Sequence, residues 1–285
     1  MTAMAAAEPA PAAPTAEAQA SGSSFYAAMR MLPAAERAAM FDIYAFCRQV
    51  DDIADEAGLA PAERRRGLDA WRADLAALYA GETPPLSGFL AGPVRRFGLR
   101  QGDFLAVVDG MQMDVDDTIV APSYAQLDLY CDRVASAVGR LSVCVFGMDE
   151  APGIALSHDL GRALQLTNIL RDLDEDAGMG RLYMPLEALE AAGITAREPR
   201  AVMADPRLDA ACRWVAQKAH AHYAAAAALM ARRPKGRLIA PRLMGAVYGE
   251  ILTRMETVGW AAPRTRVSLS KPRVVWLLLR HGLFR

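Results

Sequence analysis

Apolar residues recur three and four positions apart along most of the chain from Ser21 onward, which is the spacing of one face of an α-helix. Alanine and leucine are abundant in these stretches, and the alternating runs typical of half-buried strands are scarce. The pattern predicts a single all-α domain, residues 21–285, with about eight or more helices. Segments of turn composition separate the periodic stretches at residues 81–88, 117–123, 148–153, 177–180, 198–206 and 232–236.

Residues 1–20 depart from this pattern because they are rich in Ala and Pro and nearly free of large apolar side chains. This composition predicts a disordered tail, and it lacks the basic start and unbroken apolar run of a signal peptide. The longest late apolar run, VVWLLL at 274–279, is far shorter than the roughly 18 residues that span a bilayer. We expect a cytoplasmic protein, either free or at the inner face of the membrane.

The overall charge of −1 gives no indication of a nucleic-acid partner, but the charge is unevenly distributed. Residues 264–285 contain six Lys/Arg, no acids and a cluster of Trp and Leu. Two interpretations stay open: an interfacial helix on an anionic membrane, or a last core-packing helix with a basic outer face. The four cysteines are scattered, which predicts reduced, buried thiols, and the histidine spacing indicates no zinc site.

The first chemically informative stretch is YAFCRQVDDIADE, residues 44–56. At about 100° per residue, its helix carries a core stripe and, directly beside it, a polar face. The core stripe consists of Met40, Ile43, Cys47, Val50 and Ala54. The polar face consists of Tyr44, Arg48, Asp51 and Asp55. Carboxylates that border a core stripe are not typical of an ordinary solvated helix face.

The stretch QLTNILRDLDED, residues 165–176, repeats this arrangement with a face made of Gln165, Asn168, Asp172 and Asp176. Like charges four residues apart destabilise a helix by a few tenths of a kcal/mol, and two such faces across a cavity repel more strongly or take up protons. Divalent cations resolve the conflict. Carboxylate and amide oxygens suit Mg²⁺, with Mn²⁺ as a substitute. The predicted metal ligands are Asp51, Asp55, Asn168, Asp172 and Asp176.

Arginines accompany both acidic stretches, and arginine binds phosphate oxygens in a bidentate manner. The arginines within about a turn of the acids are Arg48, Arg171 and Arg181. An apolar cavity with acids, metals and arginines at one end suits a substrate that has a long apolar chain and a diphosphate leaving group. Departure of the diphosphate leaves a carbocation. A third acidic cluster, Asp114, Asp116 and Asp117, approaches a Pro-containing break, and we interpret it as the end of a helix.

Together these runs resemble the squalene/phytoene synthase family, which joins two prenyl diphosphates head to head. The resemblance extends from about Ser21 to about Arg273 and implies an isoprenoid-synthase-type helical bundle with a central apolar cavity. Its bacterial, hopanoid-type branch is the most similar. The runs that carry it are SGSSFY (21–26), YAFCRQVDDIADE (44–56), YCDRVASAVG (130–139) and LQLTNILRDLDEDAGMGRLYMP (164–185). Ser136 stands where the family often has Gly, and Ser23 where some relatives have Lys.

The resemblance also assigns roles to residues of this chain. The implied catalytic residues are Tyr44, Arg48, Asp51, Asp55, Tyr130, Asp172 and Asp176. The implied substrate-binding residues are Ser21, Ser24, Phe25, Tyr44, Arg48, Gln165, Asn168, Arg171, Arg181, Tyr248 and Arg266. The small Ser136 is expected to let a prenyl chain pass.

The implied reaction is the Mg²⁺-dependent condensation of two farnesyl diphosphates to a cyclopropyl diphosphate, with release of pyrophosphate and without NADPH. Two alternatives of the same family stay open: a full squalene synthase, and a phytoene or dehydrosqualene synthase of carotenoid biosynthesis. A non-catalytic assembly factor of the same fold is a third alternative. It would be favoured by eroded aspartates, whereas both acidic stretches are intact here.

Overall fold

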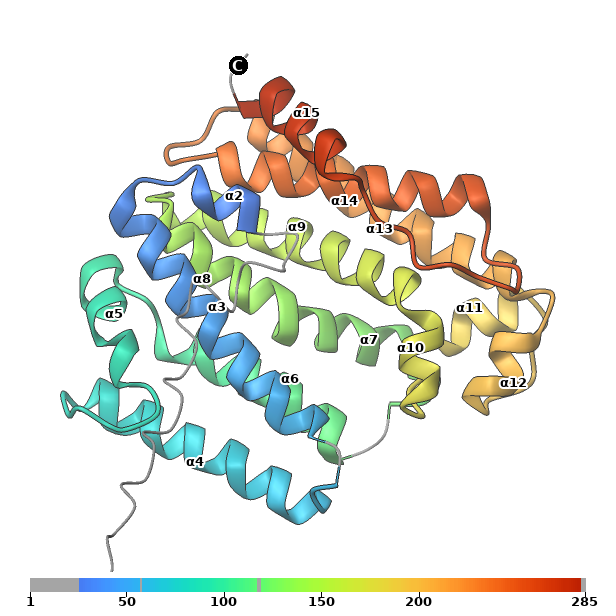
Figure 1. Cartoon of the computed structure of the whole chain (residues 1–285), viewed down its shortest axis with the longest axis horizontal. Coiled ribbons are helices and arrows are strands. Elements are labelled where there is room, and N and C mark those ends of the chain that lie inside the picture. Colours follow the sequence, from blue (N-terminus) through green and yellow to red (C-terminus); the bar gives the residue numbers. More distant parts are fainter. Residues whose placement is uncertain (1–25, 57, 117–118, 283–285) are drawn as a thin grey trace, which may run out of the picture.

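The computed structural model describes residues 26–56, 58–116 and 119–282 (Figure 1). These residues form helices, and the β-type pairing among them is a single isolated bridge between Val120 and Leu182. The predicted all-α fold is thereby confirmed. The predicted tail at residues 1–20 and the predicted site residues Ser21, Ser24 and Phe25 lie outside the described residues.

The first half of the chain forms α2 (Tyr26–Arg30), α3 (Ala34–Asp55), α4 (Pro61–Tyr79), the 3₁₀-helix η1 (Gly88–Leu90), α5 (Ala91–Phe97), α6 (Gln101–Asp116), α7 (Tyr124–Cys131) and the π-helix η2 (Asp132–Ser136). The second half forms α8 (Ala137–Val145), α9 (Glu150–Arg171), α10 (Leu173–Gly178), α11 (Leu186–Ala191), α12 (Pro199–Ala204), α13 (Leu208–Ala231), α14 (Ile239–Val258) and α15 (Lys271–Gly282). The segment 198–206, expected as a break, contains the short helix α12 because the Glu198 side chain accepts hydrogen bonds from two backbone N–H groups of its first turn.

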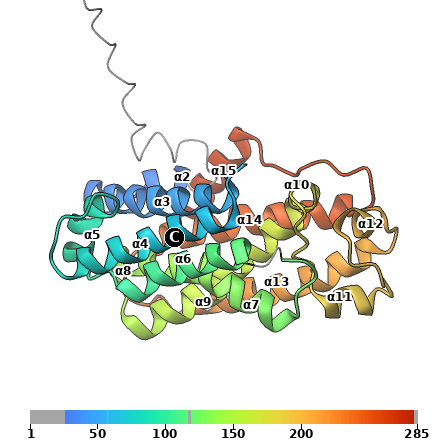
Figure 2. The ribbon, with the colours of Figure 1, turned by 90° about the horizontal axis from the view of Figure 1, so that it is seen from below.

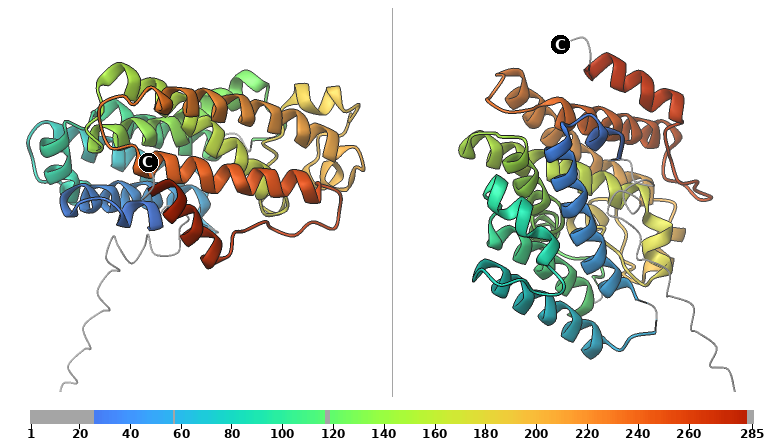
Figure 3. Two further views of the ribbon diagram at one scale, coloured as in Figure 1. Left: turned by 90° about the horizontal axis from the view of Figure 1, so that it is seen from above. Right: turned by 60° about the vertical axis from the view of Figure 1, so that its left-hand side comes forward.

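Helix α9 lies at the centre of the bundle and packs against α7, α8, η2, α13 and α14 (Figures 1 and 2). Its sequence explains this position, because buried apolar residues surround most of the helix, and such a helix must be covered on several sides. Helices α4 and α5 lie on one side of the bundle, and α13, α14 and α15 lie on the other (Figure 3).

Aromatic contacts join the helices that carry the first acidic stretch. The ring of Phe46 on α3 meets Trp71 of α4 and Phe104 of α6 edge to face, at centroid distances of 5.3 and 5.0 Å. All three side chains are buried. Edge-to-face pairs stabilise such contacts by about 1 kcal/mol beyond the area they bury, so α3 is held firmly against α4 and α6.

A close approach of η2 to α9 depends on Gly161. A Cβ atom at this position would lie 2.7 Å from the backbone N and Cα of Ser136. Ser136 is fully buried, and its hydroxyl accepts a hydrogen bond from Arg162 at 3.1 Å and donates one to the His158 carbonyl at 3.3 Å. The expected role of Ser136 in chain passage is therefore wrong: its small size permits helix packing outside the cavity lining.

The described part of the chain contains no helix that is both long and apolar enough to cross a bilayer. The four cysteines are free thiols, and Cys131 and Cys212 are buried as predicted. The Cys47 and Cys144 thiols are half-buried.

Candidate active site

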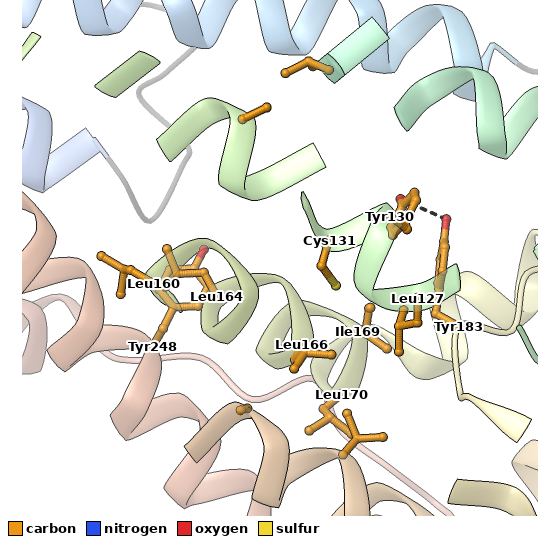
Figure 4. Packing of buried hydrophobic residues seen from close by; sticks show 14 of the residues in the cluster. Leu127, Tyr130, Cys131, Leu160, Leu164, Leu166, Ile169, Leu170, Tyr183 and Tyr248 are labelled. Atoms are coloured by element: carbon orange, nitrogen blue, oxygen red, sulfur yellow. Dashed lines mark hydrogen bonds between the residues drawn. The ribbon is translucent and has the colours of Figure 1, made fainter. Parts of the chain in front are cut away.

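An apolar cavity of about 240 Å³ lies between α2, α3, η2, α8, α9 and α14. One wall is formed by α9, from Leu156 to Asn168, a distance of about 18 Å along the helix. Leu160 and Leu164 of this wall appear in Figure 4, and the end near residue 168 is polar because it contains Tyr44, Gln165 and Asn168. The predicted central apolar cavity is thereby confirmed, with the acidic stretches at one end.

A second cavity, of about 220 Å³, adjoins the polar end of the first. The two cavities share Tyr44, Cys47 and Gln165, and the second adds Arg48, Asp51 and Tyr130. The polar face predicted for residues 44–55 therefore does border the interior of the protein.

On α3, Arg48 pairs with two neighbouring carboxylates, Asp51 at 3.1 Å and Asp52 at 2.7 Å. The Asp51 side chain is 40 % exposed. Partial burial, followed by repulsion from Asp55, raises the pKa of Asp51 to about 6 despite the Arg48 contact. Asp51 is consequently a carboxyl group that gains from a bound cation.

The second acidic stretch departs from the single helix expected for residues 165–176. Helix α9 ends at Arg171, Asp172 adopts φ −106° and ψ 17°, and α10 begins at Leu173. The helical spacing survives this interruption, because the N–H of Asp172 donates to the Asn168 carbonyl and the N–H of Asp176 donates to the Asp172 carbonyl, both at 2.9 Å. The polar face of Asn168, Asp172 and Asp176 is therefore preserved.

The two aspartates of this stretch have opposite electrostatic environments. Burial alone would raise the pKa of Asp172, but the bidentate contact with Arg171 (2.9 and 2.7 Å) and the 2.8 Å contact with Arg266 lower it. Burial, followed by repulsion from Asp172, raises the pKa of Asp176 to about 7. Asp172 thus already pairs with two arginines. The raised pKa of Asp176 indicates that a further positive charge nearby would stabilise its ionised carboxylate.

Arg181 joins the two acidic stretches. Its backbone N–H donates to the Asp176 carbonyl at 2.9 Å, and its guanidinium pairs with the Asp55 carboxylate at 2.7 Å. The Arg181 side chain is only 11 % exposed. Since Asp55 closes α3 and Asp176 belongs to α10, Arg181 links the two acidic stretches, through its backbone to α10 and through its side chain to α3.

A buried hydrogen-bonded group lies beside this junction. The Tyr130 and Tyr183 hydroxyls donate to the two oxygens of the Asp114 carboxylate at 3.0 and 2.7 Å. The two rings stack at 5.0 Å, and their hydroxyls lie 3.3 Å apart, the contact drawn as a dashed line in Figure 4. Helix α6 does end two residues after Asp114, as expected for this cluster, but the burial of Asp114 and its two tyrosine partners were not expected. The sequence did carry a signal for this position: Asp114 lies three residues after the apolar Met111, which places both side chains on the same, buried face of α6. Asp116 does lie at the end of α6, and Asp117 lies outside the described residues.

The remaining predicted residues also converge here. Tyr248 of α14 is buried, with its ring 5.9 Å from the Arg171 guanidinium carbon. Arg266 reaches Asp172 from the segment after α14 and lines a neighbouring pocket of about 260 Å³. The predicted site residues that line the two joined cavities are Tyr44, Arg48, Asp51, Tyr130, Gln165 and Asn168. Those that line the neighbouring pocket instead are Arg171, Asp172 and Arg266.

The site offers a direct test of whether a hard cation fits. The side-chain oxygen of Asn168 is buried and has no hydrogen-bond partner among the described residues, while its amide nitrogen donates to Gln165 at 3.5 Å. A buried acceptor without a donor costs about 1–3 kcal/mol. An oxygen of this kind beside Asp172 and Asp176 is suited to Mg²⁺ or Mn²⁺, so the donor set fits the expected metal.

Comparison with known proteins places this site in a family. The squalene/phytoene synthase model matches residues 18–273. The chain belongs to the squalene/phytoene synthase family. It is 59% identical over 261 residues to a presqualene diphosphate synthase of Zymomonas mobilis, covering 92% of this chain and 89% of the relative. A presqualene diphosphate synthase of Rhodopseudomonas palustris is 56% identical over 263 residues, covering 92% and 94%.

A solved structure supports the same grouping. A dehydrosqualene synthase in complex with a ligand superposes with a TM-score of 0.79 at 26% identity, covering 93% of each chain. The family acts on prenyl diphosphates and generally depends on divalent metals, so the chain is a prenyltransferase with an isoprenoid-synthase-type bundle.

Proposed function

We propose that the protein condenses two molecules of farnesyl diphosphate to presqualene diphosphate, with release of one pyrophosphate, as a step toward squalene and hopanoids. The observation that carries the proposal is the position of Arg181, which holds the Asp55 and Asp176 segments together at the polar end of an apolar cavity. The similarity to two presqualene diphosphate synthases supports the choice of product.

The carboxylates of both stretches and the Asn168 amide would hold Mg²⁺, with Mn²⁺ as a substitute. When bound, the metal supplies Lewis-acid stabilisation of the leaving pyrophosphate. The protein's own contribution is a set of arginines around it, namely Arg48, Arg171, Arg181 and Arg266. In this structure each of them pairs with a carboxylate of the site.

Tyr44 and Gln165, which line both cavities, are placed to contact the first prenyl chain as its C1–O bond breaks. The electrons of that bond leave with pyrophosphate. The C2–C3 double bond of the second farnesyl diphosphate then attacks the allylic cation. Loss of a proton closes the cyclopropane ring, and the pyrophosphate retained by the arginines is the basic group beside it. The apolar walls exclude water, which would otherwise quench the cation.

Tyr130 contributes as a neutral phenol. Burial, followed by the nearby Asp114 carboxylate, raises the pKa of Tyr130 well above its ordinary value, so the hydroxyl keeps its proton at neutral pH. Its hydroxyl is turned toward Asp114, and the residue lines the cavity beside Asp51. We assign it the stabilisation of positive charge by its ring, and not the role of a general base.

The test is to incubate the purified chain with farnesyl diphosphate and Mg²⁺, with and without NADPH, and to analyse diphosphates and hydrocarbons by mass spectrometry. We expect presqualene diphosphate in both cases, and its loss in Asp51→Asn but not in Asp69→Asn, an exposed aspartate of α4. Squalene that forms only with NADPH would indicate a squalene synthase. Turnover of geranylgeranyl diphosphate alone would indicate a phytoene synthase, and no turnover would favour the non-catalytic alternative.

We further propose that α15 contacts an anionic membrane. Val275, Trp276 and Leu279 are 51, 41 and 47% exposed, and the guanidinium carbons of Arg273 and Arg280 lie 4.1 and 5.1 Å from the Trp276 ring centre. Apolar side chains flanked by arginines suit the boundary between acyl chains and anionic headgroups. The opposite side of α15 packs against α14 (Figure 3).

The membrane proposal is tested by flotation with anionic and with zwitterionic liposomes. The full chain should float with anionic liposomes, whereas a chain cut after Ser270 and the variant Trp276→Ala should not. Equal recovery of all three proteins with lipid would show that α15 serves only as a packing helix.

A further inference from the structure

Two histidines and an aspartate meet on the outer part of the α9–α13 contact, away from the acidic stretches. The Nδ1 atoms of His158 and His222 lie 3.2 and 2.9 Å from the same oxygen of Asp159. One ligand atom of each residue lies within 4.8 Å of the others. His158 and Asp159 belong to α9 and His222 to α13, two helices that pack along much of their length (Figure 1).

The separations agree with ligands arranged around a single ion. Bonds of about 2.0–2.1 Å from a metal to imidazole nitrogen and carboxylate oxygen place neighbouring ligand atoms about 2.9–3.4 Å apart. Both nitrogen–oxygen distances in the cluster are close to this range. The two imidazole ring centres are 5.7 Å apart, and His158 is the more exposed of the two, at 52% against 19%.

The surrounding charges do not oppose a cation. The nearest guanidinium of α9 belongs to Arg162, which is fully engaged: it pairs with Asp128 at 2.6 Å and with Asp132 at 3.1 Å. Its positive charge is therefore balanced by carboxylates. Asp159 and His222 are both partly buried, with side chains about one-fifth exposed, which limits competition from water for the ligand atoms.

We propose that His158, Asp159 and His222 form a binding site for one divalent transition-metal ion, such as Zn²⁺, that links α9 to α13. Imidazole ligands favour Zn²⁺, Cu²⁺ and Ni²⁺ over Mg²⁺, so the site selects a different class of ion from the oxygen-rich site at the cavity. The metal binds the folded chain and fastens the helix that carries Asn168. This site is independent of the proposed synthase activity.

The experiment uses the full chain without a histidine tag, with millimolar Mg²⁺ present to occupy the acidic site. Zn²⁺ is titrated by calorimetry, and bound Cu²⁺ is examined by electron paramagnetic resonance. We expect one equivalent of Zn²⁺, coupling of Cu²⁺ to two nitrogens, and a rise in Tm of about 5 °C at a hundredfold excess over Kd. His222→Gln and Asp159→Asn should each weaken Zn²⁺ binding at least tenfold.

The matched control is His220→Gln. His220 lies on the same helix, but its Nε2 atom lies 2.8 Å from a carboxylate oxygen of Glu256. Its substitution should therefore leave Zn²⁺ binding unchanged. Each variant is first unfolded thermally in the presence of a chelator, and if His222→Gln is unstable, the exposed His158→Gln replaces it. No Zn²⁺ binding, Cu²⁺ without nitrogen coupling, or an equal loss in His220→Gln would overturn the proposal and leave only hydrogen bonds between the two helices.

Discussion

The raised pKa of Asp176 predicts that metal binding weakens steeply between pH 8 and pH 6. Asp176 must lose its proton before it can act as a metal ligand, and its pKa in the metal-free protein is about 7 because of burial and of repulsion from Asp172. Asp51 adds a smaller effect, since its pKa is about 6. As the pH falls, protons therefore compete with Mg²⁺ for the carboxylates of two proposed ligands, Asp176 and Asp51.

The magnitude follows from the protonated fractions. At pH 6 about 90% of Asp176 is protonated, and at pH 8 about 10%, which lowers the apparent metal affinity about tenfold. Asp51 is about half protonated at pH 6 and ionised at pH 8, which contributes about another factor of two. The expected total is roughly a 20-fold weaker affinity at pH 6 than at pH 8.

The measurement is a Mn²⁺ titration of the substrate-free chain by electron paramagnetic resonance at pH 6, 7 and 8 and at constant ionic strength. Substrate is omitted because diphosphate groups also titrate in this range. Asp176→Asn is the matched variant: it should bind Mn²⁺ more weakly at every pH but lose only about twofold from pH 8 to pH 6, through Asp51. A change below threefold in the natural chain, or an equal change in the variant, would refute the reasoning.

The same pKa shift affects stability in the metal-free protein. Asp176 titrates at about 7 when folded and near its ordinary value when unfolded, so the folded state binds the proton more tightly. Its contribution to stability is therefore lost as the pH rises from about 4 through about 7. Discounted for solvent screening, the loss is about 2 kcal/mol, and Asp176→Asn should recover it as a higher Tm at pH 8 in a chelator.

Three further substitutions test the packing and the site. Gly161→Ala places a Cβ against the Ser136 backbone and should lower the unfolding free energy by about 1–3 kcal/mol, as measured by denaturant unfolding. The control is Gly249→Ala, whose Cβ meets nothing within 4 Å and should not lower the unfolding free energy. Asn168→Ala should lower kcat at least tenfold and weaken Mg²⁺ binding without lowering the metal-free Tm, because it removes an unpartnered buried oxygen. Arg162→Met leaves Asp128 without its partner, whereas Asp132 keeps Arg140, and should cost about 1–3 kcal/mol by the same unfolding assay.

Local helical spacing is the reason that much of the site could be predicted from the sequence. The face of α3 that carries Asp51 and Asp55 follows from 100° per residue, whatever the rest of the fold does. The same spacing places Asn168, Asp172 and Asp176 together, and two backbone hydrogen bonds preserve it across the interruption at residue 172. The interruption itself left no signal, since apolar residues continue on both sides of it.

Contacts between distant segments could not be predicted in this way. The pairing of Arg181 with Asp55 joins residues 126 positions apart, and no local period encodes it. Asp114 shows a different failure: its nearness to a break suggested a helix end, yet its helical position beside Met111 directs it inward. His158 and His222 likewise meet only because α9 and α13 pack together.

The pairings at the polar end of the cavity indicate how metal and diphosphate depend on each other. In this structure, the carboxylates of Asp55 and Asp172 are neutralised by Arg181, Arg171 and Arg266. A metal alone would have to compete with these arginines, and a diphosphate alone would have to remove them from their carboxylates, which leaves buried charge unpaired. When both bind, the arginines can move to phosphate oxygens while the carboxylates move to the metal, so every charge keeps a partner. The exchange therefore predicts that metal and diphosphate bind cooperatively, each strengthening the binding of the other by the same factor.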